Sequence, residues 1–227
     1  MSGRKRKCAL SVLFHIKSLV IRVTTVGGLP DAGKAIRQEE RQHMSQIDDI
    51  KEILIDENQI REAVARIAGE IDAYYANSGK KLLLLGILKG SVIFMGDLMK
   101  QITLPVEIDF MKVSSYGSNT KTTGSVNIIL DLYRKDLPDV DILIVEDIID
   151  SGKTLSYLAD YLRLKGAHSV RTCTMLDKPS RREVDFKVDH VGFVIPDEFV
   201  IGYGLDYAEA YRALPFVGVL KPEIYTH

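Results

Sequence analysis

Three carboxylates lie next to a short loop of small and polar residues in the middle of the chain. The acids are Glu146, Asp147 and Asp150, and the loop after them reads Ser-Gly-Lys-Thr over residues 151–154. An apolar run over residues 142–145 precedes the acids and is typical of a buried parallel strand. A helical stretch follows the loop, so backbone N–H groups and the positive end of a helix dipole face the loop. This order predicts a site for a phosphate group.

The carboxylates narrow the kind of phosphate ligand, because three negative charges would repel a simple phosphate. The conflict disappears if the ligand is a sugar phosphate whose hydroxyl groups and bound Mg²⁺ lie against the acids. A Walker A nucleotide loop is the nearest alternative, but it needs glycine at position 147, where this chain has Asp147. An acidic strand end without any ligand is the other alternative.

The elements that must position this motif follow from the apolar periodicity. Asp56 and Gln59 form a predicted capping box, and apolar residues along one face continue that helix to about Ala76. Predicted helices cover 56–76, 92–100 and 155–164, and predicted strands cover 82–88, 106–113, 126–132, 142–145, 170–176, 190–195 and 215–220. Strands that alternate with helices predict an α/β fold with a mainly parallel sheet flanked by helices.

A polar stretch of twelve residues, 114–125, separates two of the predicted strands. Tyr116 is its only apolar anchor. A loop of this length inside a compact domain is usually an active-site lid or a disordered segment. We expect a long β-hairpin with a mobile lid at its tip.

Composition places the chain among ordinary globular proteins, with 46% apolar and 27% charged residues. No run reaches the roughly 18–20 apolar residues of a membrane span. A net charge of −1 gives no sign of nonspecific nucleic-acid binding. The two cysteines, Cys8 and Cys173, are too few for a disulfide framework and suit a reducing cytosol. We therefore expect a cytoplasmic protein without a membrane or nucleic-acid partner.

The first 43 residues differ from the rest of the chain, since they hold nine Lys or Arg against three acids. A secretory signal fits poorly, because the apolar patch is short and no cleavage site of small residues follows. An organelle transit peptide fits the scarcity of acids better. The interpretation we favour is a basic leader over 1–43, disordered or translated from an upstream start, ahead of a working domain over 44–227.

The central motif consists of four apolar residues, two acids, two aliphatic residues and Asp-Ser-Gly-Lys-Thr. It resembles the phosphoribosyl pyrophosphate (PRPP) signature of the type I phosphoribosyltransferases. The flanking segments are similar, from about Met44 to Tyr225, to the branch of that family that acts on 6-oxopurines. These segments are Leu88-Lys-Gly90, Ser115-Tyr116, Leu176-Asp-Lys178, residues 191–207 and Arg212. The resemblance implies the type I phosphoribosyltransferase fold, with a small hood built partly from the C-terminal segment.

The same resemblance implies a purine-salvage reaction. In it, the 5-phosphoribosyl group of PRPP moves to N9 of hypoxanthine or guanine, which gives IMP or GMP and pyrophosphate, with Mg²⁺ as cofactor. The implied contacts to PRPP and its phosphates are Lys89, Gly90, Ser115, Tyr116, Glu146, Asp147, Ser151, Gly152, Lys153, Thr154 and Arg212. The implied purine contacts are Lys178, Phe199, Val200 and Asp206, the implied Mg²⁺ contacts are Glu146, Asp147 and Asp206, and the implied catalytic base is Asp150. A cis peptide bond before Lys89 and a homodimer or homotetramer are implied as well.

Each of these residues also has a plainer interpretation. Phe199 would be ordinary core, Arg212 a surface ion pair, Asp206 a turn residue and Tyr116 loop packing. A transferase for another base, above all xanthine, and a non-catalytic regulator that senses PRPP are the alternative functions. The histidines show no ligand spacing, and we expect them to be surface or core residues.

Overall fold

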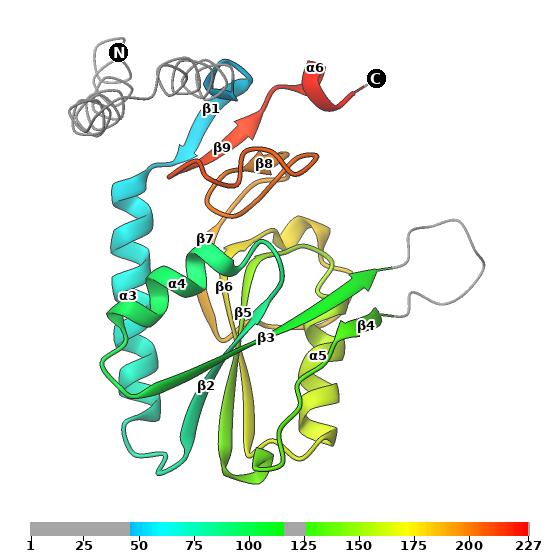
Figure 1. Cartoon of the computed structure of the whole chain (residues 1–227). Coiled ribbons are helices and arrows are strands. Elements are labelled where there is room, and N and C mark those ends of the chain that lie inside the picture. The colour runs from blue at the N-terminus through cyan, green and yellow to red at the C-terminus, as the bar shows by residue number, and fades with distance from the viewer. Residues whose placement is uncertain (1–45, 116–125, 227) are drawn as a thin grey trace, which may run out of the picture. The chain divides into compact units, whose positions relative to one another are not determined.

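The computed structural model describes residues 46–115 and 126–226 (Figure 1). The chain divides into two compact units, Met1–Asp49 and Ile50–His227. Every element discussed below belongs to the second unit. The predicted leader, Cys8 and Tyr116 lie outside the described residues, as does most of the predicted lid. No helix in the described ranges is long and apolar enough to cross a membrane.

A sheet of six strands forms the centre of the second unit, in the order β4-β3-β2-β5-β6-β7 (Figure 1). Its strands are β2 (Lys81–Ile87), β3 (Val106–Ser115), β4 (Val126–Leu130), β5 (Val140–Ile149), β6 (Ser169–Asp177) and β7 (His190–Val194). All neighbours run parallel except β3 and β4, which form an antiparallel hairpin. The predicted α/β fold with a mainly parallel sheet is therefore confirmed.

Helices cover both faces of this sheet. Alternate residues of β2 point to opposite faces, so Leu82 and Leu84 join one apolar cluster while Leu83 and Leu85 join another. The first cluster includes apolar side chains of α3 (Glu57–Tyr75) and α4 (Val92–Gln101), and the second includes those of α5 (Lys153–Leu164). Because both faces are covered, the apolar residues 82–85 of β2 and 142–145 of β5 are buried on both sides of the sheet.

Helix α3 begins where the sequence predicts it. The Asp56 carboxylate accepts hydrogen bonds from the backbone N–H groups of Asn58 (2.9 Å) and Gln59 (3.0 Å), and the Gln59 side chain accepts one from the Asp56 N–H (2.9 Å). This reciprocal pair is the predicted capping box, and it satisfies N–H groups that the first helical turn would otherwise leave free.

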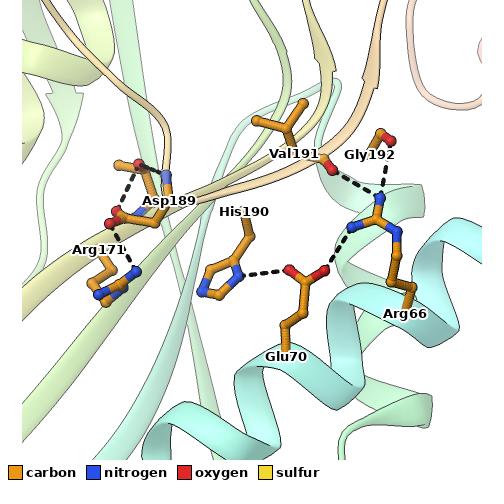
Figure 2. A network of polar contacts seen from close by, with 8 residues as sticks. Arg66, Glu70, Arg171, Asp189, His190, Val191 and Gly192 are labelled. Carbon is orange, nitrogen blue, oxygen red and sulfur yellow. Dashed lines mark hydrogen bonds and ion pairs between the residues drawn. The ribbon is translucent and has the colours of Figure 1, made fainter.

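A polar network ties α3 to the edge strand β7 (Figure 2). The Arg66 guanidinium donates to the carbonyl oxygens of Val191 (2.9 Å) and Gly192 (3.0 Å) and to the Glu70 carboxylate (2.7 Å). Glu70 also lies 3.1 Å from Nδ1 of the buried His190. Burial pulls the pKa of Glu70 upward, but the hydrogen bonds from His190 and Arg66 outweigh it and hold the pKa below its usual value. His190 is thus a core residue, as expected.

The hood is a separate sheet of three antiparallel strands in the order β1-β9-β8, made from β1 (Ile50–Ile55), β8 (Val200–Ile201) and β9 (Val217–Leu220). The C-terminal contribution is as predicted. Strand β1 was not predicted, because most of its residues are exposed or half-buried and its charged pair, Lys51 and Glu52, interrupts the apolar pattern. The hood therefore joins both ends of the second unit.

Candidate active site

Glu146 and Asp147 lie on the central strand β5, whereas Asp150 is the first residue after it. Strand β5 was predicted over residues 142–145 only, but it runs to Ile149 and pairs with β6 as far as Asp177. The prediction ended too early because carboxylates interrupt the apolar run. Pairing with β2 stops at Val145, whereas pairing with β6 continues past the acids to Ile149. Glu146 and Asp147 are consequently held by a rigid element.

The Glu146 and Asp147 carboxyl groups interact directly with each other. Burial raises the pKa of Glu146 well above its usual range, and the adjacent charge of Asp147 raises it further. Burial raises the pKa of Asp147 too, although contacts with the Glu146 side chain and the Ile148 N–H offset part of that effect. The Oε2 atom of Glu146 is buried and has no hydrogen-bond partner among the described residues. The pair therefore favours either a shared proton or a bound cation.

The turn after β2 packs directly onto this acid pair. A Cβ atom on Gly90 would lie 1.5 Å from Oδ2 of Asp147, so no other residue fits there. The peptide bond between Leu88 and Lys89 is cis, as expected. Buried Ser91 closes the turn by donating from its hydroxyl to the Ile87 carbonyl oxygen (2.6 Å). The backbone of this turn thus contacts the acids of β5.

The hood reaches the same turn from the other side. A Cβ atom on Gly204, whose φ is +101°, would lie 2.0 Å from the Gly90 carbonyl oxygen. The Arg212 guanidinium donates to the Gly204 carbonyl oxygen (2.8 Å) and pairs with the Asp206 carboxylate (2.8 Å). Lys89 and Arg212 both contact Glu209. Lys89, Arg212 and Asp206 therefore gather beside Gly90.

The loop after β5 forms the predicted phosphate cradle. Helix α5 begins at Lys153, two residues earlier than predicted, and Gly152 precedes it with φ +80°. Gly152 has no side chain to cap this helix end, and the Ser151 hydroxyl accepts a long hydrogen bond of 3.4 Å from the Lys153 N–H. The first turn of α5 therefore offers backbone N–H groups that can bind an anion. A cavity of about 350 Å³ opens there, and its polar lining comprises Glu146, Asp150, Ser151, Gly152 and Thr154. A Cβ atom on Gly152 would lie 2.9 Å from the Arg182 side chain, so Arg182 packs against this loop.

The predicted purine contacts fall in two places. Lys178 is buried at the end of β6, where its N–H donates to the Ile149 carbonyl oxygen (3.0 Å) and its Nζ lies 3.9 Å from the Asp150 carboxylate. Phe199 is 37% exposed, and its ring stacks on that of Tyr225 with 4.7 Å between centroids. Phe199 is therefore not simple core. Val200 is buried in β8.

The structure thus brings most predicted residues into recognisable groups. Lys178 and Asp150 approach each other at the end of β5. Asp147, which interacts with Glu146, packs against Gly90. Glu209 links Lys89, Arg212 and Asp206 by contacting all three. Ser115 is the last residue of β3 and pairs with Val126, and Tyr116 lies outside the described residues. Sequence reasoning missed Arg182, Gly204, Glu209 and Tyr225. The close approach of Gly204 could have been predicted from the sequence, because glycines on both sides of Tyr203 indicate a place where two backbones come close together.

The donor set suits Mg²⁺. Among residues 46–115 and 126–226, no three or more His, Cys, Asp or Glu side chains are grouped so that they alone would hold a metal ion. Mg²⁺ is usually held by one or two carboxylates together with substrate oxygens and water. The unpartnered Glu146 Oε2 beside Asp147 matches that kind of site.

Comparison with known proteins decides the family. The family model described as "Phosphoribosyl transferase domain" matches residues 50–208. The hypoxanthine-guanine phosphoribosyltransferase of Bacillus subtilis is 51% identical over 177 residues, which cover 78% of this chain and 97% of that protein. The chain belongs to the hypoxanthine phosphoribosyltransferase family. A hypoxanthine phosphoribosyltransferase of Salmonella typhimurium is 52% identical over 167 residues, 74% of this chain and 93% of that protein.

Solved structures of this family agree with the fold. A hypoxanthine phosphoribosyltransferase from Staphylococcus aureus superposes with a TM-score of 0.76 at 45% identity, covering 81% of this chain and 98% of that one.

The bifunctional protein TilS/HprT of Listeria innocua is 51% identical over 178 residues. The match covers 27% of that longer protein.

The raised pKa of Glu146 predicts a gain in stability when this acid is replaced. In the ligand-free protein with EDTA, Glu146→Gln should raise the free energy of unfolding at neutral pH. A folded-state pKa above the unfolded value means that stability is fully present below the unfolded pKa and is lost as pH rises toward the folded pKa. The advantage of the variant should grow by about 1.4 kcal/mol per pH unit through that window. Denaturant unfolding between about pH 4 and pH 8 measures it.

The matched control is Glu62→Gln, because Glu62 is exposed on α3. Its effect on stability should be small, because the side chain is exposed. A Glu146→Gln variant that is less stable than the parent at neutral pH would show that the buried carboxyl stabilises the fold, contrary to this account.

Proposed function

We propose that this chain is a purine-salvage enzyme. It transfers the 5-phosphoribosyl group of PRPP to N9 of hypoxanthine or guanine, giving IMP or GMP and pyrophosphate. One observation carries this proposal. The buried Lys178 ammonium lies 3.9 Å from Asp150, and Asp150 lines the same cavity as Ser151, Gly152 and Thr154 at the N-terminus of α5. A purine selector, a base and a phosphate cradle therefore share one edge of the sheet.

The 5′-phosphate of PRPP binds in the cradle. Backbone N–H groups at the start of α5 and the hydroxyls of Ser151 and Thr154 donate to its oxygens, with Gly152 and Lys153 completing the loop. Glu146 and Asp147 accept hydrogen bonds from the 2′- and 3′-hydroxyls of the ribose. These acids, with Asp206, would also hold Mg²⁺. When bound, Mg²⁺ neutralises charge on the departing pyrophosphate.

The purine lies against Lys178 and Phe199. An ammonium group donates hydrogen bonds and cannot accept them, so Lys178 binds the 6-oxo oxygen of hypoxanthine or guanine and disfavours the 6-amino group of adenine. One face of the Phe199 ring is a stacking surface for the purine, and the Tyr225 ring stacks on Phe199. The Val200 backbone contacts the edge of the base.

Catalysis combines proton transfer with charge stabilisation. Asp150 takes up the purine proton as N9 attacks C1′ of the ribose, and the bond from C1′ to the pyrophosphate oxygen breaks. Lys89, Arg212 and the Gly90 backbone stabilise the negative charge that develops on the leaving group. Water must be excluded from the ribosyl centre, which would otherwise be hydrolysed. The predicted lid over residues 114–125, with Ser115 and Tyr116, would do this, and most of it lies outside the described residues.

The remaining expectations concern the cellular location, the oligomeric state and the ligands of the enzyme. We propose a cytoplasmic homodimer or homotetramer that binds PRPP and a 6-oxopurine. The rival function, a regulator that senses PRPP without turnover, would not need Asp150. Asp150 lies beside Lys178 with its side chain half exposed, which favours an enzyme over a sensor.

Base specificity is the experiment that tests this function. In steady-state assays with PRPP, hypoxanthine or guanine should be turned over far faster than adenine, because Lys178 is only a donor. Lys178→Ala should raise the KM for the purine more than the KM for PRPP. The exposed Lys187 provides the control, since Lys187→Ala should leave both constants unchanged. Preference for adenine, or a KM effect confined to PRPP, would sink this assignment of Lys178.

Asp150→Asn tests the catalytic base. The amide cannot accept the purine proton, so kcat should fall about a hundredfold or more while PRPP still binds. Stopped assays give kcat, and calorimetric titration with PRPP gives the affinity. Asp160→Asn, on the exposed side of α5, is the control for loss of one charge. Near-normal turnover in Asp150→Asn would remove Asp150 from the mechanism.

A further inference from the structure

Glu209 lies between the two cations that the proposed function assigns to pyrophosphate. Its Oε1 atom is 2.7 Å from Lys89 Nζ, and its Oε2 atom is 3.2 Å from the Arg212 guanidinium. One carboxylate thus pairs with a cation from the turn after β2 and with a cation from the hood. The oxygens of pyrophosphate would need the same two cations.

The backbone around Glu209 fixes the direction of its side chain. Ala208, Glu209 and Tyr211 have φ of +50°, +65° and +73°, and such values are uncommon for residues other than glycine. The Glu209 N–H donates to the Asp206 carboxylate (2.9 Å), and Tyr207 and Ala210 exchange backbone hydrogen bonds. This turn is held by its own contacts, so it presents Glu209 to Lys89 and Arg212 even when no ligand is present.

We infer that Glu209 is an internal competitor of pyrophosphate. Its carboxylate occupies Lys89 and Arg212 in the ligand-free enzyme, and it must move away when PRPP or pyrophosphate binds. After the transfer it returns to the cations and so weakens the hold of the site on the product. This inference rests on the proposed function, because that function places pyrophosphate at Lys89 and Arg212.

The exposure of the partners sets the expected size of the effect. The side chains of Lys89 and Glu209 are 53% and 65% exposed, and ion pairs between exposed groups are weak. Arg212 also pairs with Asp206 (2.8 Å), so Glu209 is one of two carboxylates on that cation. Removing the competitor should therefore tighten pyrophosphate binding by about three- to tenfold and not by orders of magnitude.

Calorimetric titration of the full chain with pyrophosphate and Mg²⁺ tests the inference. Glu209→Gln should bind pyrophosphate about three- to tenfold more tightly than the parent, and pyrophosphate should inhibit its turnover more strongly. Asp139→Asn is the matched control. Asp139 pairs with Lys80 at 2.8 Å, is 70% exposed, and lies just before β5, at the opposite end of that strand from the acid pair. Its affinity should equal that of the parent.

A double variant separates competition from a general effect of charge. In a Lys89→Ala background, Glu209→Gln should gain much less affinity, since one of the two contested cations is absent. Unchanged or weaker binding in Glu209→Gln, or the same gain in both backgrounds, would overturn the competitor role. If neither Lys89→Ala nor Arg212→Ala weakens pyrophosphate binding, the proposed pyrophosphate site itself is wrong, which is a different result.

Discussion

The close packing of Gly90 against the Asp147 carboxylate is the constraint on which the whole site depends. A side chain at position 90 would overlap Asp147, and a side chain at position 204 would overlap the Gly90 carbonyl oxygen. Two absent side chains thus let the sheet, the turn after β2 and the hood meet at one point. Because Lys89 precedes Gly90 and Arg212 contacts Gly204, the same packing brings the cations beside the acids.

Carboxylates perform opposite tasks in this molecule, and their surroundings decide which. Glu70 accepts hydrogen bonds from Arg66 and His190, which hold its pKa down and make its charge favourable (Figure 2). Glu146 is buried beside another acid, which raises its pKa and makes its charge unfavourable. An acid that is costly to ionise in the empty protein is suited to receive a cation and sugar hydroxyls. This account predicts that the site lowers the stability of the empty protein, a trade that is common where a protein binds its ligand.

Much of the fold and the chemistry could be predicted because both rest on local patterns. Apolar runs identified the parallel strands, and Asp56 with Gln59 marked the start of α3. Strand β1 and the true length of β5 could not be predicted, since pairing with distant strands decides them and charged residues obscure the pattern.

The parts of the site that were missed depend on contacts between distant segments. Arg182 lies against Gly152 only because the stretch after β6 folds back over the loop. Glu209 lies 120 residues after Lys89, and nothing in its own neighbourhood in the sequence indicates that the two side chains meet. Residue types predict which chemistry is available, whereas the fold determines which groups compete for the same ligand.

A crystal structure with Mg²⁺, PRPP and an unreactive purine analogue tests the central claim most directly. The account predicts the 5′-phosphate at the start of α5, the ribose hydroxyls against Glu146 and Asp147, and pyrophosphate at Gly90, Lys89 and Arg212. Density for pyrophosphate away from the turn after β2, or for the base away from Lys178, would contradict it.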